Sequence, residues 1–277
     1  MPSRHSSPLC VAALLAALQF VPSLALAATP DAYDPWPGLV QDIFSNRPMN
    51  DGEGVIAIEM PIRAEDAAIV PVTLQVKLSP ADSRHVRTIT LVIDQNPAPM
   101  AARFELGRHS GVTEISTRVR VNSYTEVHAV AELSDGNLYM TKTFVKASGG
   151  CSAPATKNAD DARARLGQIR FRQFAKPADG PQSGARQAMI MIGHPNNSGL
   201  QMDQVTRLYV PAFFVNELRI WQEDNLLLAM EGGISISEDP NIRFSYIPNG
   251  SKKIRAEAKD TEGHIFENEW KTDASGT

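Results

Sequence analysis

Thr125-Glu-Val-His-Ala-Val-Ala-Glu-Leu133 and Leu138-Tyr-Met-Thr-Lys-Thr-Phe-Val145 are β-rich segments separated by Ser134-Asp-Gly-Asn137. An Asp-Gly pair between such segments is a strong hairpin signal. Similar short segments recur on both sides of this hairpin, bounded by turn residues. They occupy residues 70–78, 88–93 and 115–121 before it, and 187–192, 216–221, 226–230, 241–247, 253–258 and 264–270 after it. Two such groups predict an all-β protein with two immunoglobulin-like β-sandwich domains in tandem.

The N-terminal region predicts a signal peptide and then one short helix. Arg4 precedes an apolar run over residues 9–26, which ends in Ala25-Leu-Ala27, so we expect cleavage after Ala27. A retained membrane anchor is disfavoured because Pro22 interrupts a run that is barely long enough to span a bilayer. The mature chain is therefore expected in the periplasm, without a membrane attachment. Apolar spacing over residues 34–44 predicts the short helix.

Composition excludes several classes of site. The net charge is −4 and no basic stripe exists, so nucleic acid is not an expected partner. The histidines lack the spacing of zinc ligands, and no loop combines Cys, His and Met as a type-1 copper site requires. We therefore predict no metal and no cofactor. The histidines after the signal peptide are His85, His109, His128, His194 and His264, of which the strand residue His128 is expected to be structural.

Cys151 is the candidate functional residue. It lies in Lys146-Ala-Ser-Gly-Gly-Cys-Ser-Ala-Pro-Ala155 and is the only cysteine left once a signal peptide containing Cys10 is removed. An unpaired cysteine in an exported protein is a reactive thiol or an intermolecular link. Its small neighbours predict an accessible sulfur. Gly149 and Gly150 would give the backbone freedom of a swinging arm, with an extended reach of roughly 20 Å from Val145.

Composition also divides the chain. We predict a signal peptide at residues 1–27, a first β-sandwich at 28–147, a flexible linker carrying Cys151 at 148–184, and a second β-sandwich at 185–277. Within the linker, residues 159–166 favour a brief helix.

The first domain resembles SoxY, the sulfur-carrying subunit of the bacterial Sox thiosulfate-oxidation system, and the second resembles its partner subunit SoxZ. The SoxY-like phrases are Ile69-Val-Pro-Val-Thr73, Ile93-Asp-Gln-Asn-Pro-Ala-Pro99, Ser116-Thr-Arg-Val-Arg120, Thr125-Glu-Val-His-Ala129, Ser134-Asp-Gly136 and Gly149-Gly-Cys151. The SoxZ-like phrases are Ile192-Gly-His-Pro195, Ser198-Gly-Leu200, Val210-Pro-Ala-Phe-Phe-Val-Asn-Glu217, Glu238-Asp-Pro-Asn-Ile-Arg-Phe244 and Ala258-Lys-Asp-Thr-Glu-Gly-His264.

The single-chain arrangement is similar to fused SoxYZ-like carriers that are associated with quinoprotein dehydrogenases. The resemblance implies immunoglobulin-like domains that pair within the chain, and a cysteine, here Cys151, that carries sulfur intermediates covalently. It implies Sox-type or quinoprotein dehydrogenase partners and no enzymatic activity of its own. Two sequence features depart from the family: Ser152-Ala-Pro154 replaces the usual Gly-Gly and free C-terminus after the cysteine, and Asn196 replaces a common Met.

We therefore expect a periplasmic covalent carrier that presents a sulfur-containing group on the Cys151 thiolate to redox enzymes. The alternative is a non-catalytic binding or assembly module of a periplasmic quinoprotein dehydrogenase system, with Cys151 in an intermolecular disulfide or unused. A thiol enzyme would need a histidine beside the sulfur, for which the local sequence gives no support. His194 has two possible roles, lining the docking surface for the arm or shaping a turn before Pro195.

Overall fold

The computed structural model describes residues 34–79, 81–154, 164–174 and 184–272. The predicted signal peptide, its cleavage site after Ala27, Cys10 and most of the predicted helix at 159–166 lie outside these residues.

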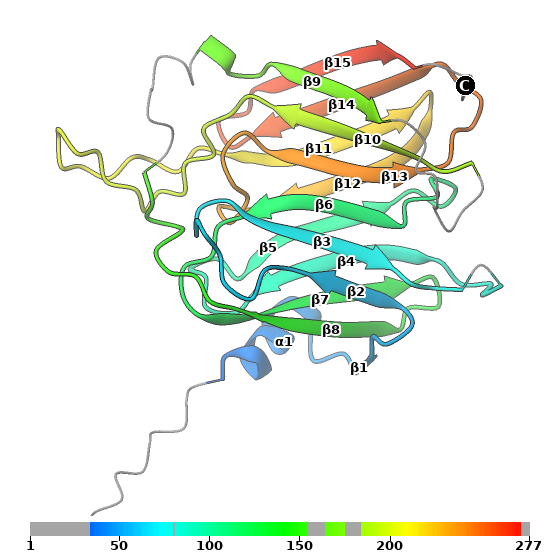
Figure 1. Ribbon diagram of the computed structural model, residues 1–277, viewed down its shortest axis with the longest axis horizontal. Coiled ribbons are helices and arrows are strands. Elements are labelled where there is room, and N and C mark those ends of the chain that lie inside the picture. Colours follow the sequence, from blue (N-terminus) through cyan, green and yellow to red (C-terminus); the bar gives the residue numbers. More distant parts are fainter. Residues whose placement is uncertain (1–33, 80, 155–163, 175–183, 273–277) are drawn as a thin grey trace, which may run out of the picture. The chain divides into compact units, whose positions relative to one another are not determined.

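Two β-sheets pack face to face and form the fold (Figure 1). The larger sheet has nine strands in the spatial order β1 (Met49–Asp51), β8 (Leu138–Val145), β7 (Thr125–Leu133), β4 (Val86–Ile93), β5 (Met100–Leu106), β12 (Asn225–Gly232), β11 (Val215–Gln222), β14 (Lys253–Asp260) and β15 (Ile265–Lys271). The smaller sheet has the order β2 (Ile56–Glu59), β3 (Val70–Val76), β6 (Glu114–Val119), β13 (Asn241–Tyr246), β10 (Arg186–Ile192) and β9 (Ile169–Phe174). The predicted all-β fold is confirmed.

The predicted short helix is also confirmed, as α1 (Trp36–Phe44). It ends at Ser45, whose left-handed backbone (φ 54°) closes the last turn. The Trp36 ring stacks on the imidazole of His128 in β7, with ring centroids 3.6 Å apart. The Nδ1 atom of His128 lies 2.9 Å from a carboxylate oxygen of Asp94, and both side chains are buried. The stack of Trp36 on His128 fixes the helix to the sheet, and Asp94 holds the His128 ring in place.

The chain has two halves, one that contains strands β1 to β8 and one that contains strands β9 to β15. The two halves share both sheets, an arrangement that the sequence did not predict. Strand β5 pairs with β12, in a register that places Leu106 opposite Leu228. Strand β6 pairs with β13, with Ser116 opposite Arg243. Each half is thus a sandwich whose two sheets continue into those of the other half. Strand β9 lies within the predicted linker 148–184 and pairs with β10, so the second half begins its sheet earlier than expected.

One continuous apolar core runs through both halves. Phe104 and Ile115 of the first half and Phe244 and Tyr246 of the second belong to it, and all four side chains are buried. Complete burial of a side chain of this size contributes about 1.5–3 kcal/mol to folding. The shared core therefore holds the halves in a fixed relation, so residues from both can build one site.

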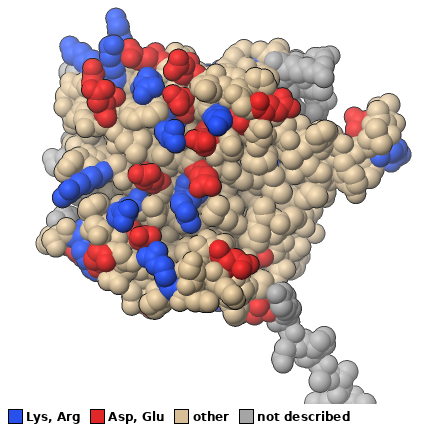
Figure 2. All heavy atoms as spheres, turned by 180° about the vertical axis from the view of Figure 1, so that it is seen from behind, with Lys and Arg blue, Asp and Glu red and all other residues tan. Residues whose placement is uncertain are grey.

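The outer face of the nine-stranded sheet is polar. Acidic and basic side chains alternate across it (Figure 2), as in the pairs Glu217–Arg219 at 3.2 Å and Lys253–Glu269 at 2.9 Å. Exposed ion pairs of this kind contribute little to stability. Within the part of the chain that the structure describes, no helix is both long and apolar enough to cross a lipid bilayer.

Candidate functional site

The loop that carries Cys151 follows strand β8 and is bonded to the chain beyond β6. We call residues 147–154 the Cys151 loop. The amide of Gly149 donates to the carbonyl of Asn122 at 2.8 Å, and that of Gly150 donates to the carbonyl of Val121 at 3.0 Å. A turn closes over the cysteine because the amide of Ser152 donates to the carbonyl of Gly149 at 3.2 Å. The loop is thus held to the end of the sandwich.

The Cys151 side chain is buried, with 0% of the residue exposed. Burial raises the pKa of the thiol to about 11, and the attraction of the Arg120 guanidinium only partly opposes this shift. The prediction of an accessible sulfur is therefore wrong. Small neighbours do not imply exposure, since they also let other backbone segments approach closely and cover the sulfur.

The two glycines beside Cys151 fit the loop against the fold, whereas the sequence predicted that they free it. A Cβ atom on Gly150 would lie 2.0 Å from the carbonyl oxygen of Ala67, so only glycine permits this close approach. Gly149 has a φ of 78° and no atom near its missing Cβ. Gly149 therefore supplies a left-handed turn conformation, while Gly150 supplies space.

Arg120 is the charged group beneath the loop and is itself buried. Its Nη1 atom donates to the carbonyl of Gly150 at 3.2 Å, and Nη2 donates to the carbonyl of Asn196 at 3.4 Å. The Nε atom is buried without a hydrogen-bond partner among the described residues. Burial lowers the pKa of Arg120, against the attraction of Glu238, Cys151 and Asp66. The guanidinium is treated as charged, because arginine is not deprotonated in proteins at neutral pH.

Asn96 organises the backbone that follows Arg120. Its Nδ2 atom donates to the carbonyl of Arg120 at 2.7 Å and to the hydroxyl of Ser235 at 2.9 Å. Its Oδ1 atom accepts from the amide of Asn122 at 2.8 Å. The side chain is buried, with its amide group donating twice and its carbonyl oxygen accepting once, so it ties this end of the first half to Ser235 of the second.

The second half of the chain contributes the other wall of the site. The hydroxyl of Ser198 donates to the carbonyl of Cys151 itself, and the amide of Ser198 donates to Oε1 of Gln201 at 2.9 Å. Asn196, with a φ of 43°, donates through Nδ2 to the carbonyl of Ile236 at 3.3 Å and accepts from the amide of Val215 at 3.1 Å. The cysteine of the first half is therefore seated against the second.

His194 is buried, so of its two predicted roles the one on a docking surface is wrong, and the one in a turn is supported. Its Nδ1 atom accepts from the amide of Asn196 at 3.1 Å, which shapes the turn that presents Asn196 to Arg120. Its Nε2 atom lies 3.6 Å from a carboxylate oxygen of Asp260, which also bonds to His264 at 2.8 Å. Burial lowers the pKa of His194, although Asp260 opposes the shift. The residue acts beneath the surface, through the turn.

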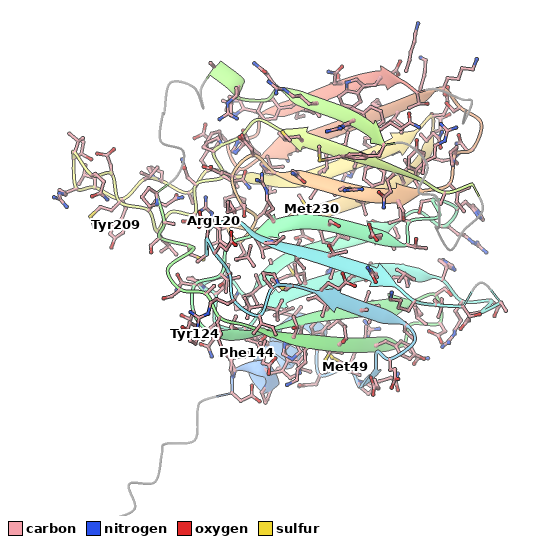
Figure 3. The ribbon with its side chains drawn as sticks, viewed as in Figure 1. Met49, Arg120, Tyr124, Phe144, Tyr209 and Met230 are labelled. Atoms are coloured by element: carbon pink, nitrogen blue, oxygen red, sulfur yellow. The ribbon has the colours of Figure 1, made fainter. Side chains whose placement is uncertain are left out.

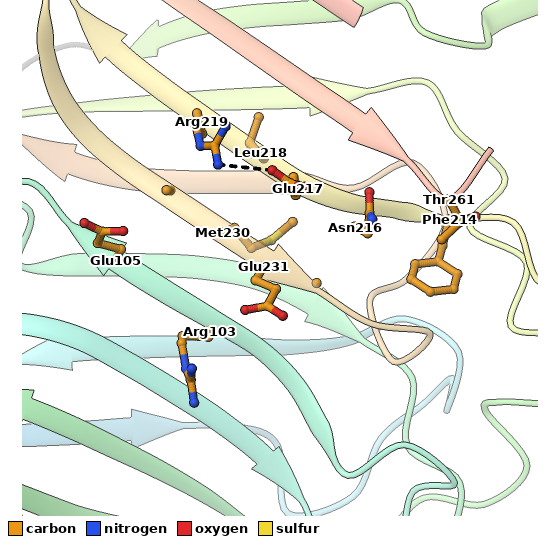
Figure 4. A pocket seen from close by; sticks show the side chains of 12 residues that line it. Arg103, Glu105, Phe214, Asn216, Glu217, Leu218, Arg219, Met230, Glu231 and Thr261 are labelled. Carbon is orange, nitrogen blue, oxygen red and sulfur yellow. Dashed lines mark hydrogen bonds and ion pairs between the residues drawn. The ribbon is translucent and has the colours of Figure 1, made fainter. Parts of the chain in front are cut away.

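Other potential sites lie elsewhere. Among the described residues, no group of three or more His, Cys, Asp and Glu side chains is arranged to hold a metal ion. A shallow hollow of about 560 Å³ lies on the nine-stranded sheet (Figure 4), where Arg103, Glu105, Glu217, Arg219 and Glu231 mix both charges. None of its lining residues bonds to the Cys151 loop, so we do not connect it with the thiol.

Sequence reasoning found Cys151 but missed the residues that hold it. Arg120 alternates with Val119 and Val121 in the sequence, which predicts an exposed polar position rather than a buried charge. Asn96 precedes two prolines, in Asn96-Pro-Ala-Pro99, a pattern that predicts a turn. Ser198 lies 47 residues from the cysteine that it contacts. Only the shared sheets bring these residues together.

Comparison with known proteins places two family models in tandem on the chain. The model described as "Sulfur oxidation protein SoxY" matches residues 40–151 and so ends at Cys151. The model described as "Sulphur oxidation protein SoxZ" matches residues 175–271. No curated protein matches the chain.

Solved structures give weak similarities. A superoxide reductase (neelaredoxin) from Ignicoccus hospitalis matches with a TM-score of 0.30 and 15% identity, over 34% of this chain and 79% of its own. A putative superoxide reductase from Thermotoga maritima matches with a TM-score of 0.31 and 17% identity, over 36% and 92%. One from Archaeoglobus fulgidus has a TM-score of 0.28 and 16% identity, over 37% and 98%. We draw no conclusion from these matches.

Proposed function

Because the chain belongs to the SoxY and SoxZ sulfur oxidation families, with both parts on one polypeptide, we propose that it is a periplasmic carrier whose Cys151 thiolate holds a sulfur-containing group. The proposal adds the attachment residue and the compartment to the carrier role that the families support. The observation that supports it is that residues from both family-matched parts hold the Cys151 loop: Arg120 binds the carbonyl of Gly150, and Ser198 binds the carbonyl of Cys151. The periplasmic location in this proposal rests on the signal peptide that the sequence predicts at residues 1–27.

In the closed conformation the thiol is protected from reaction. With a pKa of about 11, only about one thiol in ten thousand is ionised at pH 7. The thiolate is the reacting form of cysteine, and here it is also covered. A carrier at rest benefits from such protection, since a stray disulfide or oxidant would otherwise occupy the sulfur. Loading then requires the Cys151 loop to move away from the sandwich so that the sulfur is exposed.

The loop is held by bonds that can break without disturbing the sheets. They are the two glycine amide bonds to Val121 and Asn122, the Arg120 bond to Gly150, and the Ser198 bond to Cys151. Each contributes about 0.5–1.5 kcal/mol, or somewhat more for the charged donor. None belongs to a strand ladder. Local opening of the loop is therefore much less costly than unfolding of the sandwich.

The chemistry of loading requires a partner. Forming an S–S bond between the Cys151 thiol and a second thiol-level sulfur removes two electrons and two protons. An electron acceptor must therefore take part, and a periplasmic redox enzyme of the Sox or quinoprotein dehydrogenase type would supply it. When a thiolate of a partner attacks that S–S bond, the group leaves Cys151 by thiol–disulfide exchange, without net oxidation. On this proposal the protein carries the sulfur while its partners carry the electrons.

Intact-mass spectrometry of the protein isolated from its native periplasm tests the proposal. We expect a mass increase that a thiol reductant removes and that Cys151→Ser lacks, with the folded state of the variant unchanged. An unmodified Cys151 whose replacement has no effect on sulfur oxidation would contradict it. Non-reducing electrophoresis tests the alternative, since an assembly module linked through Cys151 would run as a stable covalent dimer.

A further inference from the structure

Residues 199–211 form a hairpin that projects from the end of the sandwich at which the Cys151 loop lies (Figure 1, yellow). We call it the apolar hairpin. The amide of Val210 donates to the carbonyl of Gln201 at 2.8 Å, and that of Asp203 donates to the carbonyl of Leu208 at 2.9 Å. The Asp203 carboxylate accepts from the amide of Thr206 at 2.7 Å and closes the tip. These bonds give the projection a defined shape.

The tip of this hairpin exposes large apolar side chains. Val205 is 91% exposed, Leu208 69% and Tyr209 65%, and Figure 3 shows Tyr209 on the projecting segment. Asp203 and Arg207 are the only charged residues between 199 and 211, and their charges cancel. Exposure of these side chains to water is unfavourable, because burial of apolar surface lowers the free energy by about 25 cal/mol per Å². Clusters of exposed apolar side chains mark interaction sites.

The base of the hairpin is joined to the candidate site. Asn197 and Phe213 exchange two backbone hydrogen bonds, of 2.7 and 3.0 Å, and so hold the ends of the hairpin together. The next residue, Ser198, donates its hydroxyl to the carbonyl of Cys151. A protein bound to the hairpin would therefore lie beside the Cys151 loop.

Further exposed apolar side chains lie on segments that bond to this loop or to Lys146 immediately before it. Tyr124 is 56% exposed and follows Asn122, whose carbonyl accepts from Gly149. Ile62 is exposed, and its carbonyl accepts from the amide of Lys146 at 2.8 Å, just before the loop. Figure 3 shows Tyr124 and Tyr209 at the same end of the molecule. Apolar surface thus borders the Cys151 loop on segments from both halves.

We propose that the apolar hairpin is the docking element for a redox enzyme that exchanges the sulfur group with Cys151, and that this enzyme offers an uncharged, apolar cleft. The proposal rests on the proposed function. A neutral tip fits an uncharged cleft better than an acidic or basic one. An anionic membrane surface is disfavoured because such surfaces bind clusters of Lys and Arg, and the hairpin has one Arg.

Substitution at the tip tests the proposal without disturbing the core. The full-length protein, Leu208→Asp and Ile265→Asp are each incubated with thiosulfate and periplasmic extract from the source organism. Ile265 is 63% exposed on the edge strand β15 and does not bond to the Cys151 loop, so it is a matched control. Intact mass measures the adduct on Cys151, and iodoacetamide alone measures the accessibility of the thiol.

We expect Leu208→Asp to slow adduct formation at least tenfold, with unchanged iodoacetamide labelling and with Ile265→Asp behaving as wild type. Equal adduct formation in Leu208→Asp and wild type would overturn the docking proposal while leaving the carrier function intact. No adduct on any of the three would overturn the carrier function and the docking proposal with it. Self-association, or flotation with phosphatidylglycerol vesicles, that Leu208→Asp abolishes would assign the hairpin to a second copy or to a membrane, and would also overturn it.

Discussion

The guanidinium of Arg120 and the carbonyl oxygen of Gly150 are joined by a hydrogen bond of 3.2 Å, one residue before the Cys151 thiol. Both residues are buried. The same guanidinium reaches the carbonyl of Asn196 in the second half of the chain. Arg120 therefore connects the covered cysteine to the fold that covers it, and its removal should affect the loop before it affects the sheets.

Arg120→Met should expose Cys151 more often. Loss of the bond to Gly150 costs the closed loop about 1.5 kcal/mol, which corresponds to roughly tenfold more open molecules. We expect iodoacetamide to label Cys151 about ten times faster at pH 8 in the folded variant. The control is Arg118→Met, since Arg118 bonds to the carbonyls of Glu238 and Asp239 and not to the Cys151 loop. Equal labelling rates in the two variants would contradict the role of Arg120.

The two glycines before Cys151 should respond differently to alanine. Gly150→Ala places a Cβ 2.0 Å from the carbonyl oxygen of Ala67, so the closed loop cannot form and labelling should approach the rate of an unprotected thiol. Gly149→Ala meets no atom and strains only the left-handed backbone, at a cost of about 1 kcal/mol. Its labelling should increase less than tenfold. Labelling kinetics rank the two, and the reverse order would refute the close-approach role of Gly150.

Asn96→Ala should destabilise the whole protein. It removes three hydrogen bonds and leaves the carbonyl of Arg120 and the amide of Asn122 without their partner. Unsatisfied buried groups cost about 1–3 kcal/mol each, so we expect the free energy of unfolding to fall by about 3 kcal/mol or more. Urea denaturation measures the change. A loss below about 1 kcal/mol would show that water replaces the side chain.

Alkaline pH should weaken the fold through Cys151. Burial raises the pKa of the thiol from 9.0 to about 11, so the folded state disfavours the thiolate. The stabilisation is complete below pH 9 and is lost as pH rises towards 11. Between pH 8.5 and 10.5, wild type should lose about 2 kcal/mol more than Cys151→Ala in urea denaturation. Parallel curves for the two proteins would mean that the thiolate is not excluded.

The strands were largely predictable because their side chains alternate. Each β-rich segment named in the sequence analysis contains a strand, and the Asp135-Gly136 turn joins β7 to β8 as expected. Strand β5 was missed since it follows a proline-rich turn and lacks a clear alternation in Met100-Ala-Ala-Arg103. Its pairing with β12 is what joins the halves, so the continuous sheets could not be inferred without it.

The site was less predictable than the fold. The pattern around Cys151 identified the residue but not its environment, because glycine is used both for freedom and for close approach. Burial of Arg120 and the contact from Ser198 depend on packing between segments far apart in sequence. Of the two roles predicted for His194, the surface role is wrong because the residue is buried, whereas its hydrogen bond to the Asn196 amide supports the role in a turn.

Native-state labelling of Cys151 in increasing urea tests most directly whether the closed loop opens by itself. The account predicts a labelling rate that is slow compared with a free thiol and nearly independent of urea at low concentrations, since local opening exposes little surface. The rate should rise steeply only near the unfolding transition. A rate that follows global unfolding from the lowest urea concentration would contradict it, because Cys151 would then be reachable only in the unfolded chain.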